Sequence, residues 1–131
     1  MRGALADEPF SNYYLNNETL FKIQSDVIRE LAEKGSCLFV GRCADYVLQE
    51  NPRCLNVFIS AAMNDRIKRI AEIRKISADK ARDFVEKADK KRAGYYNYFS
   101  NKVWGAAESY HLCVNSSILG IDESVAFIRY F

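Results

Sequence analysis

Apolar residues recur at helical spacing over the first quarter of the chain. The apolar positions lie three or four residues apart: Leu20, Ile23, Val27, Ile28 and Leu31. This spacing predicts a helix with one apolar face. Asn17 is suited to cap its start, and Gly35 is suited to end it. Residues 1–15 carry Gly, Pro, Ser and Asn without a period, which predicts an irregular lead-in.

Three short runs are mostly apolar, as is typical of strands buried on both faces of a parallel sheet. These are Ser36–Val40, Leu55–Ile59 and Leu112–Asn115. Helical patterns alternate with them: 43–49, from 64 or 65 to 75, from 77 to 100, and from 122 onward. The alternation predicts an α/β fold with a parallel sheet and helices on both faces. With 131 residues, 49% of them hydrophobic, we expect a single domain.

Composition excludes several classes of protein. The sequence has no apolar run of membrane-spanning length and no signal-peptide pattern, so we expect a cytoplasmic protein without a membrane partner. Four cysteines without a Cys-x-x-Cys pair predict reduced, mostly buried thiols. His111, the only histidine, is expected to be structural. We predict no metal site and no Ser-His-Asp triad.

Charge is distributed unevenly along the chain. Residues 66–92 contain eleven Lys or Arg and five Asp or Glu, a local charge of +6, which leaves −4 for the rest of a chain with net charge +2. Such a segment can contact phosphates, or it can be a solvated helical surface with compensating i,i+4 pairs. The acidic remainder and the lack of a recognised motif argue against nucleic acid as a partner.

The stretch Gly41–Tyr46, Gly-Arg-Cys-Ala-Asp-Tyr, follows the first strand-like run and opens a helical pattern. Ligands of open α/β sheets bind at this end of a strand. Arg42 can hold a phosphate there through its planar fork of donors. The 131 residues contain no Gly-x-x-x-x-Gly-Lys-Ser/Thr loop that would cradle a triphosphate.

In the helix that begins after Ser77, the apolar stripe places Arg92 on the packed face. An arginine in an apolar stripe is costly unless it is paired. Asp89, three residues earlier, offers a structural ion pair. Alternatively, Asp89 and Arg92 project together into a cleft, where one accepts hydrogen bonds from a base and the other holds a phosphate.

Taken together, these motifs resemble the cytidylate kinase-like family of P-loop nucleoside monophosphate kinases. The resemblance covers roughly Asn16 to the C-terminus. The motifs that carry it, in order, are Gly41-Arg42, Asp65-Arg66-x-x-Arg69, Asp89-x-x-Arg92, Tyr95-Tyr96-Asn97-Tyr98, Trp104-Gly105 and Asn115-Ser116-Ser117-x-Leu119-Gly120-Ile121.

The resemblance implies roles for individual residues. Arg42 is similar to the arginine that holds the acceptor monophosphate, and Arg92 to a catalytic arginine on the transferring phosphates. Asp89 resembles the carboxylate that recognises cytosine. Arg66 and Arg69 fall in the stretch leading to the lid near the donor nucleotide, unless they are exposed helix cations. The segment 115–120 resembles the loop near the donor base, and it is equally suited to be a plain turn and helix start.

The sequence departs from the family pattern at two positions. The family usually has Gly-Arg-Asp at this point, and Cys43 stands in place of the aspartate. Asp45 is therefore the nearest carboxylate for the acceptor site. Val85 stands where another phosphate-binding arginine is expected. These departures leave the acceptor base undetermined.

The resemblance also implies an N-terminally truncated member, without the first strand and phosphate loop. We therefore expect part of an ATP- and Mg²⁺-dependent phosphotransferase acting on CMP-type acceptors, inactive as this chain. The alternative is a noncatalytic nucleotide- or phosphate-binding regulatory protein. The first strand of such kinases lies between the runs 36–40 and 55–59. We therefore expect strand exchange in a homodimer, a separate N-terminal phosphate-loop segment, or direct pairing of these two runs.

Overall fold

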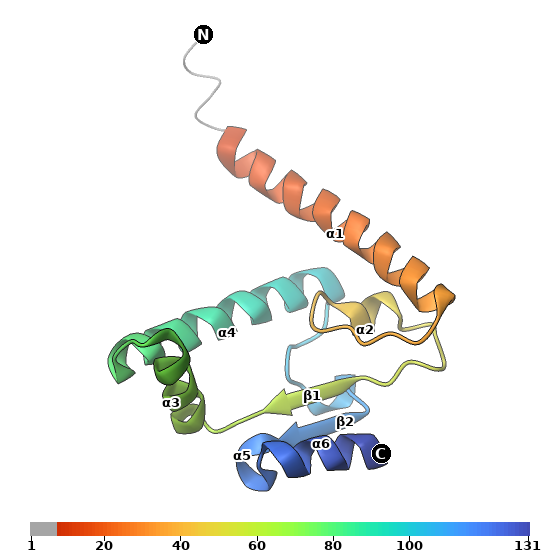
Figure 1. Cartoon of the computed structure of the whole chain (residues 1–131). Helices are drawn as coiled ribbons and strands as arrows, with labels where there is room; N and C mark the ends of the chain where they lie inside the picture. The colour runs from red at the N-terminus through yellow and green to blue at the C-terminus, as the bar shows by residue number, and fades with distance from the viewer. Residues whose placement is uncertain (1–7) are drawn as a thin grey trace. The chain divides into compact units, whose positions relative to one another are not determined.

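The computed structural model describes the backbone of residues 8–131 and the side chains of residues 16–131. It divides into two compact units, Met1–Cys54 and Leu55–Phe131. The described elements, in chain order, are α1 (Glu8–Lys34), α2 (Ala44–Val47), β1 (Val57–Ser60), α3 (Met63–Arg74), α4 (Ala78–Ser100), the 3-10 helix η1 (Ala107–Ser109), β2 (Leu112–Asn115), α5 (Ser116–Leu119) and α6 (Ile121–Tyr130). Figure 1 shows them along the chain.

The long helix α1 dominates the first unit. It ends before Gly35, as predicted, but it begins at Glu8, so Asn17 lies inside the helix and does not cap it. The prediction of an irregular lead-in is wrong for residues 8–15, while residues 1–7 lie outside the described part. Buried Ser25 donates its hydroxyl to the carbonyl oxygen of Phe21 at 2.7 Å, which satisfies it within the helix.

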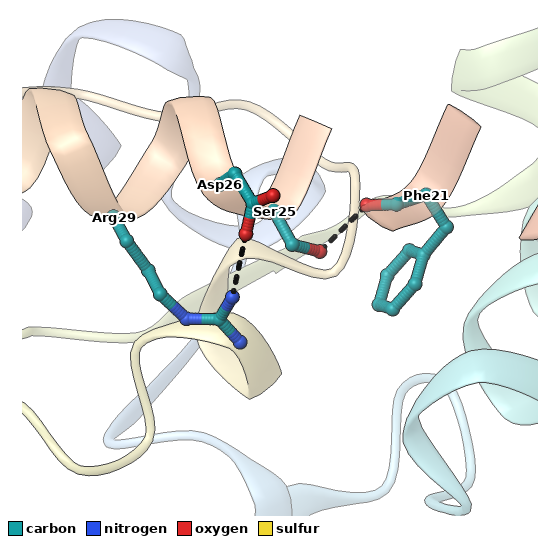
Figure 2. A network of polar contacts seen from close by, with 4 residues as sticks. All are labelled: Phe21, Ser25, Asp26 and Arg29. Carbon is teal, nitrogen blue, oxygen red and sulfur yellow. Dashed lines mark hydrogen bonds and ion pairs between the residues drawn. The ribbon is translucent and has the colours of Figure 1, made fainter. Parts of the chain in front are cut away.

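Charged side chains cover the outer surface of α1. Figure 2 shows the pair between Arg29 and Asp26, whose Nη1 and Oδ1 atoms are 3.5 Å apart, beside the Ser25 hydrogen bond. A second pair joins Lys34 and Glu30 at 2.9 Å. Such exposed pairs one helical turn apart add only about 0.3–0.5 kcal/mol each. The core contacts of Phe21, Ile28 and Ala32 therefore hold the helix more than these pairs do. The other apolar residues of the stripe are about half exposed: Leu20, Ile23, Val27 and Leu31.

A small core joins α1 to α2. It consists of Ile28, Ala44, Val47 and Leu48, with Phe21, Ala32, Phe39 and Cys54 packed against it. The run 36–40 lies between these helices. Its Phe39 turns toward the core, whereas Leu38 and Val40 are 91% and 87% exposed.

The prediction of a buried strand at Ser36–Val40 is wrong. Among the described residues they belong to no strand, and the sheet pairs only β1 with β2. A strand needs a neighbouring backbone that takes its N–H and C=O groups. No described segment supplies that neighbour for this run.

The second unit contains the parallel sheet. The two strands β1 and β2 are paired in parallel, with Val57 opposite Leu112 and Ser60 opposite Asn115 (Figure 1). The prediction of parallel strands is confirmed for these two runs, with β1 shifted two residues toward the C-terminus at its start. The described structure is thus a helix-rich α/β arrangement with a two-stranded sheet.

A helical hairpin of α3 and α4 follows β1 (Figure 1). The hydroxyl of Ser77 accepts a hydrogen bond from the N–H of Lys80 and so caps α4, as predicted. Lys75 ends α3 in the left-handed region. Between the two helices lie the buried side chains of Ile67, Ala81 and Val85. The guanidinium of Arg74, 4.0 Å above the ring of Phe84, covers the turn end of the hairpin.

An aromatic cluster closes one end of the second unit. The ring of Phe58 on β1 contacts Trp104 edge-on, with centroids 5.4 Å apart, and Tyr110 at 4.9 Å. The N–H of Trp104 donates to Oδ1 of Asn97 at 2.8 Å, and that of Gly105 to the hydroxyl of Tyr110 at 3.2 Å. These contacts fix the loop after α4 against the strand.

Candidate functional site

A strained turn presents Arg42. Gly41, Arg42 and Cys43 have φ values of +74°, +58° and +56°, three successive residues in the left-handed region. Glycine adopts this conformation readily, but each of the other two costs about 1 kcal/mol or more. The turn is closed by the N–H of Ala44, which donates to the carbonyl oxygen of Gly41 at 3.2 Å. It leaves the side chain of Arg42 exposed and that of Cys43 buried at 4% exposure.

An apolar groove with a volume of about 260 Å³ lies beside this turn. One wall is formed by α1, with Ile23, Val27 and Leu31, and the other by the extended segment that ends in Arg42. Sequence reasoning missed this groove, although the helical stripe that lines it was visible. The groove could have been predicted because only a few residues join the apolar stripe of α1 to the apolar run 37–40, which keeps the two close together.

Asp45 lies close enough to two thiols to influence both. Burial, and secondly the negative charge of Asp45, raise the pKa of Cys43 to about 11, and the same two causes raise the pKa of Cys54. Both thiols therefore stay protonated near neutral pH and are poor nucleophiles. The sequence prediction of buried cysteines fits Cys43, whereas Cys37 and Cys113 are exposed.

Asp89 is joined to Arg66, not to Arg92. Nη1 of Arg66 donates to Oδ2 of Asp89 at 2.8 Å, and Nη2 donates to Oδ1. The two side chains are 30% and 24% exposed. These hydrogen bonds raise the pKa of Arg66, with a further contribution from the charge of the carboxylate. Of the two alternatives for Asp89, the ion pair with Arg92 is not formed, because the partner of Asp89 comes from the neighbouring helix.

Arg92 is exposed and makes no ion pair or hydrogen bond in the part of the chain that the structure describes. The pairs Arg66–Asp89 and Arg74–Phe84 show that α3 and α4 run antiparallel. Arg92, three residues after Asp89, is therefore level with the first residue of α3. The apolar stripe of α4 continues beyond the first residue of α3. Helix α3 therefore does not cover Arg92, although Arg92 lies on that stripe.

The remaining predicted positions of the hairpin have different surroundings. Arg69 is an exposed cation on α3. Val85 is 3% exposed, which suits an apolar residue and leaves no space for the arginine that the family pattern would place there. On α3, Arg66 is paired with Asp89, and Arg74 lies over the ring of Phe84.

Polar side chains tie together the loops that follow β1 and β2. The hydroxyl of Ser117 accepts from the N–H of Ala62 at 2.8 Å, and that of Ser116 donates to the carbonyl oxygen of Ser60 at 3.2 Å. Asn115 caps α5 by accepting from the N–H of Ser117 at 3.0 Å. The segment 115–120 thus starts a short helix, and its place near a donor base stays a prediction.

His111 has a structural role. Its Nδ1 accepts a hydrogen bond from the N–H of Asn56 at 2.8 Å, just before the parallel strands begin to pair. Within residues 16–131, no group of three or more His, Cys, Asp or Glu side chains could hold a metal ion. No helix in residues 8–131 is long and apolar enough to cross a bilayer.

The predicted site residues fall into two groups. Arg42 and Asp45 belong to the first unit, and Arg66, Arg69, Asp89 and Arg92 to the second. Within the second unit the structure brings Arg66 and Asp89 together, with Arg92 one turn further along α4. Convergence of Arg42 and Arg92 on one anion stays a prediction.

The fold and these groups describe a helix-rich α/β protein with an arginine-bearing turn after an extended apolar segment. The sequence profile of the cytidylate kinase-like family matches residues 1–118. The chain belongs to this family, and the resemblance found in its motifs is confirmed.

One solved structure gives a detailed comparison. It is described as an uncharacterized protein from Eubacterium ventriosum ATCC 27560, with a TM-score of 0.77 and 30% sequence identity. The similarity covers 84% of this chain and 63% of that chain, so the present chain spans less than two thirds of the other protein. No curated protein matches the chain significantly.

Proposed function

We propose that this chain is the acceptor and lid portion of a cytidylate kinase-like phosphotransferase, which moves a phosphoryl group from ATP to a CMP-type nucleoside monophosphate. Membership in the family supports this function. The observation that carries it is the strained turn that presents Arg42 at the end of an apolar groove. Backbone strain of this kind is concentrated at functional sites.

The groove and the arginine suit the two halves of a nucleoside monophosphate. Apolar walls from α1 and the extended segment can cover a flat base, and a guanidinium can hold the phosphate through two parallel hydrogen bonds. Asp45, the second residue of α2, is the carboxylate nearest to Arg42 along the chain. The proposal assigns the monophosphate to Arg42, with Arg92 reaching the transferring phosphates.

The donor side is proposed on the family resemblance alone. The reaction would take ATP together with Mg²⁺, and Arg66 and Arg69 would face the donor nucleotide. The 131 residues contain no loop of the Gly-x-x-x-x-Gly-Lys-Ser/Thr type. Phosphoryl transfer depends on positioning and on electrostatic stabilisation by such a loop, its lysine and the metal. Each donor of this kind contributes about 3–4 kcal/mol to lowering a barrier, so we expect negligible turnover by this chain alone.

Binding tests the acceptor half. CMP, dCMP, UMP and cytidine are titrated into the purified chain at low and at physiological salt. We expect the monophosphates to bind more tightly than the nucleoside and to weaken with salt. Arg42→Ala should abolish the preference for monophosphate, whereas Arg53→Ala, which removes an exposed arginine from the same unit, should keep it. Equal affinity for CMP and cytidine would contradict the proposal.

A coupled kinase assay tests the catalytic half. The chain is assayed with ATP, Mg²⁺ and CMP, alone and with a separately added segment that carries a phosphate loop. We expect turnover only with the added segment. Magnesium-dependent turnover by the chain alone, retained on repurification and lost in Arg92→Ala, would overturn the expected inactivity. The alternative function, a noncatalytic phosphate-binding regulator, requires monophosphate binding with no turnover in either mixture.

A further inference from the structure

The ion pair between Arg66 and Asp89 has the geometry with which an arginine grips a phosphate. Both terminal nitrogens of Arg66 donate to the two carboxylate oxygens of Asp89. Carboxylate and phosphate share this two-point geometry on a guanidinium, and phosphate carries the larger charge. We propose that Asp89 is an internal placeholder for a phosphate group at Arg66, and that a phosphorylated ligand displaces the carboxylate and opens the ion pair between α3 and α4.

The exposure of the pair makes such an exchange feasible. With side chains 30% and 24% exposed, Arg66 and Asp89 remain in contact with water. A carboxylate released from such a position is solvated again, so its release lacks the large cost of unpairing a fully buried charge. The pair is strong enough to define one conformation of the hairpin and weak enough for a dianion to replace it.

The rest of the hairpin confines this opening to one end. Near the turn, Arg74 covers the ring of Phe84 at 4.0 Å. Further along, Ile67 of α3 and Val85 of α4 are buried. These contacts do not involve Asp89, so they persist when the ion pair separates. The movement therefore affects the first turn of α3, which directly follows β1.

Arg92 provides the second cation for the incoming phosphate. It lies level with this first turn of α3 and makes no ion pair or hydrogen bond among the described residues. The surrounding segment 66–92 carries a charge of +6, which raises the local concentration of anions. The ligand is thus a phosphate or polyphosphate, and the inference rests on the proposed function only for the choice of this chemical class.

Two consequences follow from thermodynamic reciprocity. Asp89 competes with the ligand, so removing its charge raises the affinity of the site for phosphate. Conversely, the bound ligand keeps Asp89 apart from Arg66. If Asp89 had only a structural role, removing its charge would change the stability of the hairpin but would not raise its affinity for phosphate.

The experiment compares Asp89→Asn with Asp83→Asn in the full chain. Asp83 is an exposed carboxylate on the same helix, so its replacement changes the net charge equally without touching the ion pair. Inorganic tripolyphosphate is titrated at low salt, and amide hydrogen exchange of residues 63–67 is followed with and without it. We expect Asp89→Asn to bind tripolyphosphate about tenfold more tightly than the wild type and to exchange faster in residues 63–67 before any ligand is added.

The outcomes separate this inference from the proposed function. Equal affinities of Asp89→Asn and Asp83→Asn would overturn the placeholder role. The double variant Arg66→Asp with Asp89→Arg should restore slow exchange but not phosphate binding at residue 66. Failure of the proposed function would instead appear as equal binding of CMP and cytidine, which involves Arg42 and leaves the tripolyphosphate result unchanged.

Discussion

Two runs of similar apolar composition have different structures in this chain. Val57–Ser60 becomes β1 because β2 pairs with it over four residues. Ser36–Val40 pairs with no strand in the described structure, and its Leu38 and Val40 are exposed. The difference teaches that an apolar run does not make a strand by itself, because a strand also requires a partner that the run cannot supply.

The aromatic packing on β1 provides the largest test of this comparison. Phe58→Ala removes the ring that joins Trp104 and Tyr110, and we expect it to destabilise the second unit by about 3 kcal/mol. Urea unfolding followed by fluorescence of Trp104, the only tryptophan, measures this. Tyr130→Ala, which truncates a 90% exposed aromatic residue, should change the stability by less than about 0.5 kcal/mol.

The same experiment on the unpaired run completes the comparison. At protein concentrations below those of self-association, Leu38→Ala should leave stability nearly unchanged, as measured by unfolding followed by far-ultraviolet circular dichroism. A loss above about 1 kcal/mol would show that Leu38 is buried in solution by a contact beyond the described structure.

Thiol reactivity distinguishes the unpaired run from the turn that follows it. Cys37 is exposed, whereas burial and Asp45 raise the pKa of Cys43 to about 11. A raised pKa lowers the thiolate fraction at every pH below it, so near pH 8 Cys43 should be alkylated roughly a hundredfold more slowly than Cys37. Timed alkylation with peptide mass spectrometry measures both sites in one sample. Comparable rates would mean that the turn opens readily.

Self-association tests the run Ser36–Val40 in another way. An apolar run that pairs with no described strand can pair with another chain. We expect the chain to associate at micromolar concentrations. Replacing Leu38 and Val40 by serine should weaken this association about tenfold, as measured by sedimentation. A chain that stays monomeric, with or without these substitutions, would contradict the expectation of strand exchange and favour a separate partner segment.

Two glycines provide the smallest contrast between the units. Gly105 has a φ of +81°, and a Cβ there would lie 3.3 Å from the ring of Phe58. Gly105→Ala should therefore cost about 1–2 kcal/mol. Gly35, which follows α1, has open space around it, so Gly35→Ala should be neutral or slightly stabilising. Urea unfolding of both variants gives the comparison, and a cost at Gly35 equal to that at Gly105 would contradict it.

The candidate site was predictable in part. The Gly41–Arg42 motif stands out because glycine and arginine follow an apolar run, and the structure adds the left-handed conformation of Arg42 and Cys43, which no residue type announces. The spacing of Asp89 and Arg92 suggested a pair within one helix. Across the antiparallel hairpin, however, Arg66 reaches Asp89 with both terminal nitrogens, a geometry that Arg92 on the same helix does not share.

The sequence by itself determined what depends on neighbours a few residues away: the helices of the hairpin, the cap at Ser77, the two runs that form the sheet, and the family. Helical hydrogen bonds close over four residues, so spacing and capping residues suffice to predict them. Tertiary structure alone decided that β1 pairs with β2 and that Asp89, 23 residues from Arg66, is held by it. These outcomes depend on where the chain returns in space, and the local pattern carries no information about that.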